Sequence, residues 1–302
     1  LNVILFDNFI TNFFLYLKMF RLKQWTKNLL VFLPALIFPR EINLEIFNVL
    51  MITFLLFCCS SGLIYIVNDW VDREADAVNK NKKNRPFASK DLILSDALKG
   101  FFFLSIIFIF LFYKMYKISP GVCILISVYL TQSFLYSFYL KNITLLEMLI
   151  VSTGYSYRAL AGGLSVYLLP SSWMLLTIFL ASIFIIAQKR LSDVLSVENQ
   201  TMLRPSAKVY SNEYLNLITG IAAGSAIISY ILFTLSDYAQ VKFQNPYLPI
   251  SSIFIIYATL RYLQIAMSSS KAHDPINLII HDKHMTTCVL SCFIFIIITN
   301  YL

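Results

Sequence analysis

Long apolar runs recur along the whole chain and are separated by short polar segments. Most runs approach the roughly 20 residues that an α-helix needs to cross a bilayer. This pattern predicts an all-α integral membrane protein, a single bundle of about nine transmembrane helices. The glycine pairs Gly162–Gly163 and Gly220/Gly224 (GxxxG) are expected to allow close helix packing. The expected helices are residues 28–39, which is short for a span, 45–67, 96–116, 119–140, 143–167, 172–188, 212–236, 247–268 and 285–302.

The composition supports one membrane domain over residues 1–302 and no soluble domain. Hydrophobic residues make up 58% of the chain and charged residues only 13%, whereas soluble domains carry about 25% charged residues. All five cysteines lie in apolar runs without a CxxC pair, so neither a disulfide nor a zinc site is predicted. The net charge of +8 in so apolar a chain indicates cytoplasmic loops and anionic substrates rather than nucleic acid.

The distribution of lysine and arginine predicts which helix ends face the cytoplasm. Residues 18–28 are basic and contain a tryptophan, so residues 1–27 are expected to form an interfacial segment. If the polar loop at 68–95 is cytoplasmic, the same side receives the 189–211 loop and 19 of the 24 Lys and Arg residues. The positive-inside rule then places the N-terminus and the 68–95 loop in the cytoplasm, with the plasma membrane as the expected location.

An acidic segment with helical spacing follows the second apolar run. Asn68, Asp72 and Asp76 are four residues apart, so on a helix each is turned by only about 40° from the last, with Asp69 at the edge of the same face. One or two carboxylates completed by substrate phosphates are the usual environment of Mg²⁺. The alternative is a solvated charged loop between two membrane helices. Basic residues suited to phosphate follow at once, namely Lys80, Lys82, Lys83 and Arg85.

Ionisable residues also occur in and after the fifth apolar run. Arg158 and Glu147 lie within it, and an ionisable group at membrane depth is a functional candidate because it is costly unless satisfied. Lys189 and Arg190 follow the sixth run, three or four residues before Asp193, and suit a substrate phosphate. Structural alternatives stay open: Arg158 can pair with Glu147, and the two basic residues can be positive-inside anchors.

Several stretches together resemble the UbiA superfamily of membrane prenyltransferases. NDxxDxxxD at 68–76 is similar to that superfamily's first acidic motif. Asn79-Lys80 stands where the resembled family usually has His-Pro, and Asp193 stands where it usually has Glu. Within the superfamily the chain most resembles the decaprenyl-phosphate phosphoribosyltransferases, through RLKQWTKNLLVFLPALIF (21–38), NDWVDREADAVNKNKKNRPFAS (68–89), YRALAGGLSVYLLPSSWMLL (157–176), KRLSD (189–193), RYLQ (261–264) and DPINLIIHDK (274–283).

The resemblance implies a reaction and a set of site residues. The implied reaction is Mg²⁺-dependent transfer of 5-phosphoribose from phosphoribosyl diphosphate to a polyprenyl phosphate, for cell-wall or surface-polysaccharide precursors. By the same resemblance Asp72 and Asp76 are catalytic, and they bind Mg²⁺ together with Asn68. The residues implied to bind substrate are Lys27, Asn68, Lys82, Arg85, Arg158, Lys189 and Arg190.

Three other functions compete with this interpretation. A UbiA-type aromatic prenyltransferase would use a prenyl diphosphate donor, but its second DxxxD motif is missing after the sixth apolar run, where KRLSD stands instead. A transporter is disfavoured because no inverted repeat is evident and the charges gather at one interface. A CDP-alcohol phosphotransferase would need a DGxxAR…GxxxDxxxD pattern, which the sequence lacks.

Overall fold

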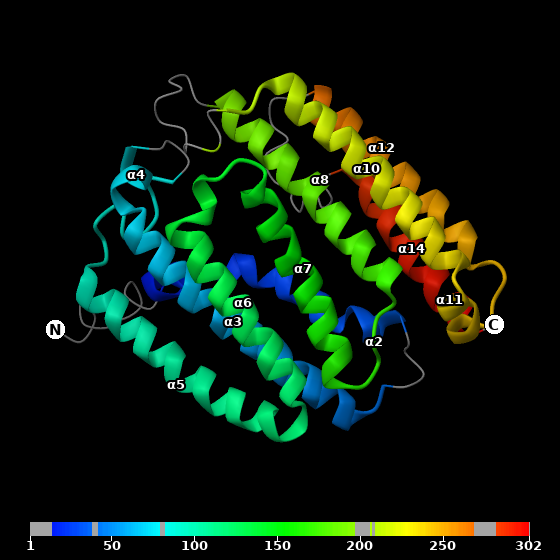
Figure 1. Cartoon of the computed structure of the whole chain (residues 1–302), viewed down its shortest axis with the longest axis horizontal. Coiled ribbons are helices and arrows are strands. Elements are labelled where there is room, and N and C mark those ends of the chain that lie inside the picture. Colours follow the sequence, from blue (N-terminus) through cyan, green and yellow to red (C-terminus); the bar gives the residue numbers. More distant parts are fainter. Residues whose placement is uncertain are drawn as a thin grey trace.

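The chain folds into long helices that lie roughly side by side (Figure 1). The computed structural model describes residues 14–37, 42–78, 82–196, 206, 209–268 and 282–301, and every regular element within them is an α-helix or a 3₁₀-helix. The start of the predicted interfacial segment, Asn79-Lys80 and most of the 274–283 stretch lie outside the described residues. The elements are η1 (Leu22–Phe32), α2 (Leu33–Ile37), α3 (Leu44–Val71), α4 (Arg73–Val78), α5 (Leu94–Ile118), α6 (Pro120–Phe138), η3 (Leu140–Asn142), α7 (Leu146–Ser165), α8 (Ser172–Ser196), α10 (Asn212–Leu235), α11 (Asp237–Phe243), η5 (Leu248–Ser251), α12 (Ser252–Ser268) and α14 (Lys283–Tyr301).

Six helical stretches among the described residues are long and apolar enough to cross a membrane: α3, α5, α6, α8, α10 and η5 continued by α12. The expected count of about nine spans is therefore not confirmed. The 20-residue helix α7 carries Glu147 and Arg158 and is not among the six, and the apolar part of α14, Lys283–Ile298, is shorter than the others. Of the stretch expected at 28–39, which is too short for a span, the described residues 28–37 form the end of η1 and the short α2.

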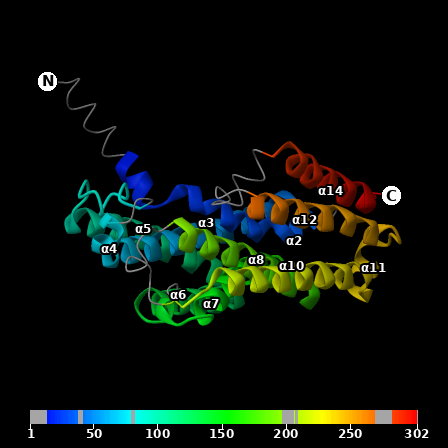
Figure 2. The same cartoon turned by 90° about the horizontal axis from the view of Figure 1, so that it is seen from above.

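Helix α3 is the centre of the bundle. Of its apolar span 67% is buried, against 22% to 39% in the other five, so α3 contacts protein where they face outward. The main core cluster joins α3, through Leu50 and Phe57, to Met19, to Met115 of α5 and to Ile126 of α6. Figure 2 shows α14 outermost on one side of the bundle and α6 and α7 on the other.

Ion pairs such as Asp76–Arg85 and Asp72–Lys141 lie at the end of the bundle where α3 runs into α4; Figure 1 shows this end beside the label of α4. Because successive helices alternate in direction, α5, α7 and α10 begin near this end, and α6 and α8 end there. Hydrogen bonds tie the connections together: Tyr210 Oη accepts from the Leu145 amide at 2.8 Å, and Ser206 Oγ donates to the Lys141 carbonyl at 2.9 Å. The fold therefore brings residues from several distant segments next to the acidic segment.

Glycine allows a close approach at α7 but not at α10. A Cβ on Gly162 would lie 1.9 Å from the carbonyl oxygen of Val31 in η1, and one on Gly163 would lie 2.5 Å from that of Leu168. The expected close helix packing is confirmed at Gly162, whereas Gly163 meets the segment that directly follows its own helix. The expectation was wrong for the GxxxG pair of α10, because no described atom lies within 4 Å of a Cβ built on Gly220 or Gly224.

This contrast predicts opposite effects of the same substitution. Gly162→Ala should lower the free energy of unfolding by about 1–3 kcal/mol, because a backbone carbonyl would have to move away from the new methyl group. Gly224→Ala, the matched control, should be neutral or stabilise the helix by about 0.5–1 kcal/mol, because alanine loses less backbone entropy than glycine. Unfolding of both purified variants in one detergent measures the difference. Equal stability of the two variants would contradict the proposed tight contact between η1 and α7.

Candidate functional site

The acidic segment lies at the junction of α3 and α4. The helical path is nearly continuous there: the Asp72 amide donates to the Asn68 carbonyl at 2.9 Å, and the Asp76 amide donates to the Asp72 carbonyl at 2.8 Å. Asp72 itself has φ −87° and ψ 3°, outside regular helical values, so α3 ends at Val71 and α4 begins one residue later. The predicted helical spacing of the three polar residues is thus present in the backbone.

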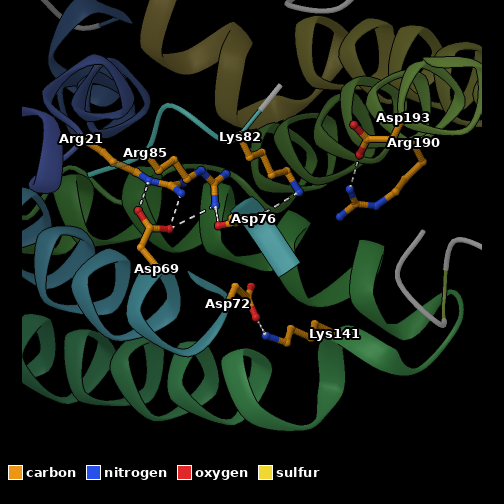
Figure 3. Close-up of polar contacts among 9 residues, drawn as sticks. All are labelled: Arg21, Asp69, Asp72, Asp76, Lys82, Arg85, Lys141, Arg190 and Asp193. Carbon is orange, nitrogen blue, oxygen red and sulfur yellow. Dashed lines mark hydrogen bonds and ion pairs between the residues drawn. The ribbon is translucent and has the colours of Figure 1, made fainter. Parts of the chain in front are cut away.

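Asp69 and Asp76 form the centre of this segment and converge on one guanidinium group (Figure 3). Each is only 3% exposed. Arg85 Nη1 lies 3.2 Å from Asp69 Oδ1 and also contacts Asp76 Oδ2, while Lys82 Nζ lies 4.0 Å from Asp76 Oδ1. Arg21 holds Asp69 from the other side, with Nε 2.8 Å from Oδ2 and a second contact through Nη2. Asp69, which was expected at the edge of the functional face, is therefore central. The sequence signal for this position was its seven-residue spacing from Asp76, which is about two helical turns.

A turn after α4 presents Arg85 to the aspartates. The Arg85 amide donates to the Lys82 carbonyl at 2.9 Å, and buried Phe87 packs edge-on against Trp70 of α3 with ring centroids 5.7 Å apart. Burial and the neighbouring charge of Arg21 lower the pKa of Arg85. A guanidinium starts from so high a pKa that Arg85 stays cationic at neutral pH. The turn therefore fixes a permanent positive charge between two buried carboxylates.

Asp72 has a different basic partner, which the sequence analysis missed. Lys141 Nζ lies 2.6 Å from Asp72 Oδ1, and Lys141 is only 8% exposed (Figure 3). Lys141 belongs to η3, between α6 and α7, and is 69 residues from Asp72 along the chain. The sequence analysis counted it only among the cytoplasmic basic residues, because nothing local relates it to the acidic segment.

Arg190 belongs to a buried ion-pair network. Helix α8 extends to Ser196, so Lys189, Arg190 and Asp193 lie on its last turns and not in a loop. Arg190 binds both carboxylate oxygens of Glu147, at 2.6 and 2.7 Å, and Asp193 at 2.9 Å. Glu147 is fully buried. The geometry thus gives Arg190 a role in joining α8 to α7, and its contact with substrate stays a prediction.

Arg158 lies deep in the bundle among neutral partners. It is 5% exposed and donates to Asn28 Oδ1 at 2.7 Å, to Tyr129 Oη at 3.0 Å and to the Gly154 carbonyl. The alternative ion pair with Glu147 is not formed, because that carboxylate binds Arg190. An arginine whose described contacts are all neutral keeps its charge uncompensated, which suits an anionic ligand.

Arg158 lies close to a second cation, Lys27 of η1. Lys27 lies over the ring of Tyr155, with Nζ 5.9 Å from the centroid, and its charge interacts with that of Arg158. Lys189 is exposed, and its charge interacts with those of Lys27 and Lys82. Lys27 and Arg158 therefore lie against the same Tyr155 ring, 5.9 and 5.8 Å from its centroid, while Lys82 lies 4.0 Å from Asp76 Oδ1 at the carboxylates.

The carboxylates fit a Mg²⁺ ion that is shared with substrate phosphates. Among the described residues no group of three or more His, Cys, Asp or Glu side chains lies together as a complete metal site. Asp69 and Asp76 nevertheless reach the same nitrogen of Arg85, so oxygens of two carboxylates converge on one cationic position. Carboxylate oxygens are the ligands that Mg²⁺ prefers, with phosphates and water completing the set. The assignment of Asn68, Asp72 and Asp76 as metal ligands stays a prediction, to which the geometry adds Asp69.

Comparison with known proteins identifies the family of the chain. The model of the UbiA prenyltransferase family matches residues 29–280. The chain belongs to the UbiA prenyltransferase family. It is 29% identical to the decaprenyl-phosphate phosphoribosyltransferase of Corynebacterium glutamicum, over 95% of this chain and 86% of the relative. It is 25% identical to the protein of the same name from Mycobacterium tuberculosis, over 91% of this chain and 90% of the relative.

Solved UbiA structures confirm the predicted fold. A UbiA homologue from Archaeoglobus fulgidus bound to GPP and Mg²⁺ has a TM-score of 0.70 at 15% identity, covering 95% of this chain and 100% of that one. The apo UbiA homologue from Aeropyrum pernix has a TM-score of 0.61 at 12% identity, covering 94% and 98%. Together with the six long apolar helices, these findings establish a multi-pass membrane transferase of the UbiA family.

Proposed function

We propose that this UbiA protein transfers the 5-phosphoribosyl group of phosphoribosyl diphosphate to a polyprenyl phosphate. The observation that carries the proposal is the number of cations near the paired carboxylates: Lys82 and Arg85 contact Asp76, and Lys27 and Arg158 lie together at the Tyr155 ring. Two phosphorylated substrates need more positive charge than a prenyl diphosphate and a neutral aromatic acceptor. The names of the relatives from C. glutamicum and M. tuberculosis support the same choice.

In the proposed reaction an oxygen of the lipid phosphate attacks the anomeric carbon of the ribose. The new bond joins that oxygen to the anomeric carbon, and the bond from this carbon to the diphosphate breaks, so diphosphate leaves with the electron pair. Bound Mg²⁺ would neutralise charge on the leaving diphosphate. Asp69, Asp72 and Asp76, with Asn68, are the residues that would hold it. A phosphate nucleophile is already ionised at neutral pH, so the chain need not supply a strong general base.

The basic residues would divide between the two substrates. Lys82 and Arg85, next to Asp76, are placed to bind the donor's diphosphate. Lys27 and Arg158 lie deeper and suit the phosphate of the lipid, whose tail would extend into the bilayer. Lys189 is exposed near the end of α8 and would bind a phosphate of one of the two substrates. The excess of basic residues at this end supports an active site on the cytoplasmic face of the plasma membrane.

A prenyl transfer to an aromatic acceptor is the second candidate. It is favoured by the solved structures of UbiA homologues bound to GPP and to DMAPP, which share this fold. The end of α8 argues against this candidate, because an aromatic prenyltransferase would need a second acidic motif there. There the chain carries Lys189 and Arg190, with Asp193 paired to Arg190.

A transfer assay separates the two candidates. Purified protein is incubated with Mg²⁺, radiolabelled phosphoribosyl diphosphate and a polyprenyl phosphate, and the label entering the organic phase is measured. We expect Mg²⁺-dependent transfer that EDTA abolishes. Parallel reactions contain labelled geranyl diphosphate and 4-hydroxybenzoate. Labelling in those reactions alone would reject the phosphoribosyl donor and retain the UbiA prenyltransferase chemistry.

A further inference from the structure

The connection between η3 and α7 contains a strained turn. Leu145 has φ 66° and ψ −47°, and the Leu146 amide donates to the Thr144 carbonyl at 2.8 Å across it. This is a γ-turn of the rare form with positive φ at its central residue, which is strained for a residue that has a Cβ atom. The Leu145 side chain is 42% exposed, so its own packing does not explain the turn. Another contact must hold the backbone in this conformation.

That contact comes from Tyr210, in the connection that precedes α10. Its hydroxyl accepts from the Leu145 amide at 2.8 Å, and its side chain is only 5% exposed among residues of α7 and α8. In the same two connections Ser206 Oγ donates to the Lys141 carbonyl at 2.9 Å. Each hydrogen bond joins residues that are 65 positions apart in the chain. Together they fix the γ-turn against the connection between α8 and α10.

The γ-turn is also where α7 begins. The Leu145 carbonyl accepts from the amides of Met148 and Leu149 at 3.0 and 3.1 Å, so the first turn of the helix is built on it. Glu147 lies in that first turn and binds Arg190 through both carboxylate oxygens. A change in the γ-turn would therefore move Glu147, and with it the basic end of α8, Lys189 and Arg190.

We propose that Tyr210 is a positioning residue of the candidate site: its hydroxyl holds Leu145 in the strained γ-turn and so fixes Glu147 and the basic end of α8. Without the hydroxyl, the Leu145 amide loses its acceptor and the turn relaxes toward the negative φ that a leucine prefers. The phosphate expected at the basic end of α8 would then meet displaced ligands. The inference rests on the proposed function for the identity of the substrates, but not for the structure of the turn.

Hydrogen exchange of the intact protein in detergent, followed by mass spectrometry, tests the hydroxyl directly. In Tyr210→Phe the amides of residues 146–149 should exchange about tenfold faster than in the wild type, the effect of losing one hydrogen bond. Tyr214→Phe is the matched control and should exchange like the wild type. The Tyr214 ring stacks on that of Tyr210, and its hydroxyl has no hydrogen-bond partner among the described residues. Equal exchange in Tyr210→Phe and the wild type would overturn the proposal.

A second substitution tests whether strain is the reason that the hydroxyl is needed. Glycine adopts positive φ without steric cost, so Leu145→Gly in the Tyr210→Phe background should restore protection of the first turn of α7. The control is Tyr167→Gly in the same background. Tyr167 also has positive φ, 60°, but it lies at the far end of α7 and is 81% exposed. Restoration by neither substitution, or equally by both, would overturn the assignment to the γ-turn.

Steady-state kinetics of the transfer reaction test the positioning role. Tyr210→Phe should raise the KM for one phosphorylated substrate by about tenfold and change kcat by less than about twofold, because binding groups are displaced and the acidic segment is not. The double variant with Leu145→Gly should return the KM to near the wild-type value. A Tyr210→Phe protein with lost protection and an unchanged KM would show that Tyr210 only stabilises the fold, and would overturn its positioning role.

Failure of the inference and failure of the proposed function give different results. Exchange is measured without substrate, so it tests the γ-turn whichever reaction the protein catalyses. If only geranyl diphosphate is used as a donor, the proposed function is rejected, and the kinetics are measured with that donor instead. If exchange in Tyr210→Phe matches the wild type, the inference is rejected even where phosphoribosyl transfer is observed.

Discussion

Asp76→Asn is expected to reduce Mg²⁺-dependent turnover by at least about 100-fold, the scale on which removal of one charge-stabilising group slows an enzyme. The carboxylate is 3% exposed and lies against Arg85 at the centre of the acidic segment. Asparagine has the same shape but no charge, so a metal held there with diphosphate would lose an anionic ligand. The initial rate of the transfer assay across a range of Mg²⁺ concentrations measures the loss. Asp72→Asn should behave in the same way.

A folded protein is expected despite this change. Arg85 retains Asp69 at 3.2 Å, so its guanidinium is not left buried without a carboxylate. Asp91→Asn is the matched control, because Asp91 is exposed and follows the same turn, and its rate should stay close to that of the wild type. If Asp76→Asn retained nearly the activity of Asp91→Asn, Asp76 would be a structural partner of Arg85 and not a metal ligand.

The features that the sequence predicted correctly are those that depend on local periodicity. The runs behind α3, α5, α6 and α10 were identified because apolar length is sufficient to predict a membrane helix. The spacing of Asn68, Asp72 and Asp76 was correct because i, i+4 spacing is a property of the helix itself. Family resemblance supplied the chemistry, which no periodicity contains.

What the sequence could not predict was the pairing of charges across the fold. Lys141 and Asp72 are 69 residues apart, and Arg21 and Asp69 are 48 apart, so no local pattern connects them. The sequence analysis considered only Arg158 as a partner of Glu147, and the observed pair with Arg190 depends on how α8 packs on α7. The prediction of close packing at Gly220 and Gly224 was wrong for the same reason. A GxxxG pattern describes one face of one helix, whereas close packing needs a second helix against that face.

Glu147→Ala is expected to lower the free energy of unfolding by about 3–5 kcal/mol, the usual effect of removing one partner of a buried ion pair. Glu147 is fully buried and binds Arg190 through two oxygens, at 2.6 and 2.7 Å. Without it, the guanidinium keeps only Asp193 among its described carboxylate partners, and that side chain is 36% exposed. Denaturation of the purified variant in mixed micelles measures the loss. The control is Glu74→Ala, whose 87% exposed carboxylate pairs with Arg73 at the surface and should contribute less than about 1 kcal/mol.

A double variant decides whether Arg190 also contacts substrate. Replacing both partners with methionine removes the buried charges together, so Glu147→Met with Arg190→Met should recover much of the stability lost by Glu147→Ala. If Arg190 only joins α8 to α7, the recovered protein should also recover its transfer rate. If Arg190 binds a phosphate, as the family resemblance implies, the double variant should be stable and yet have a raised KM for one substrate. A double variant as unstable as Glu147→Ala would contradict the view that the cost arises from an unpaired buried charge.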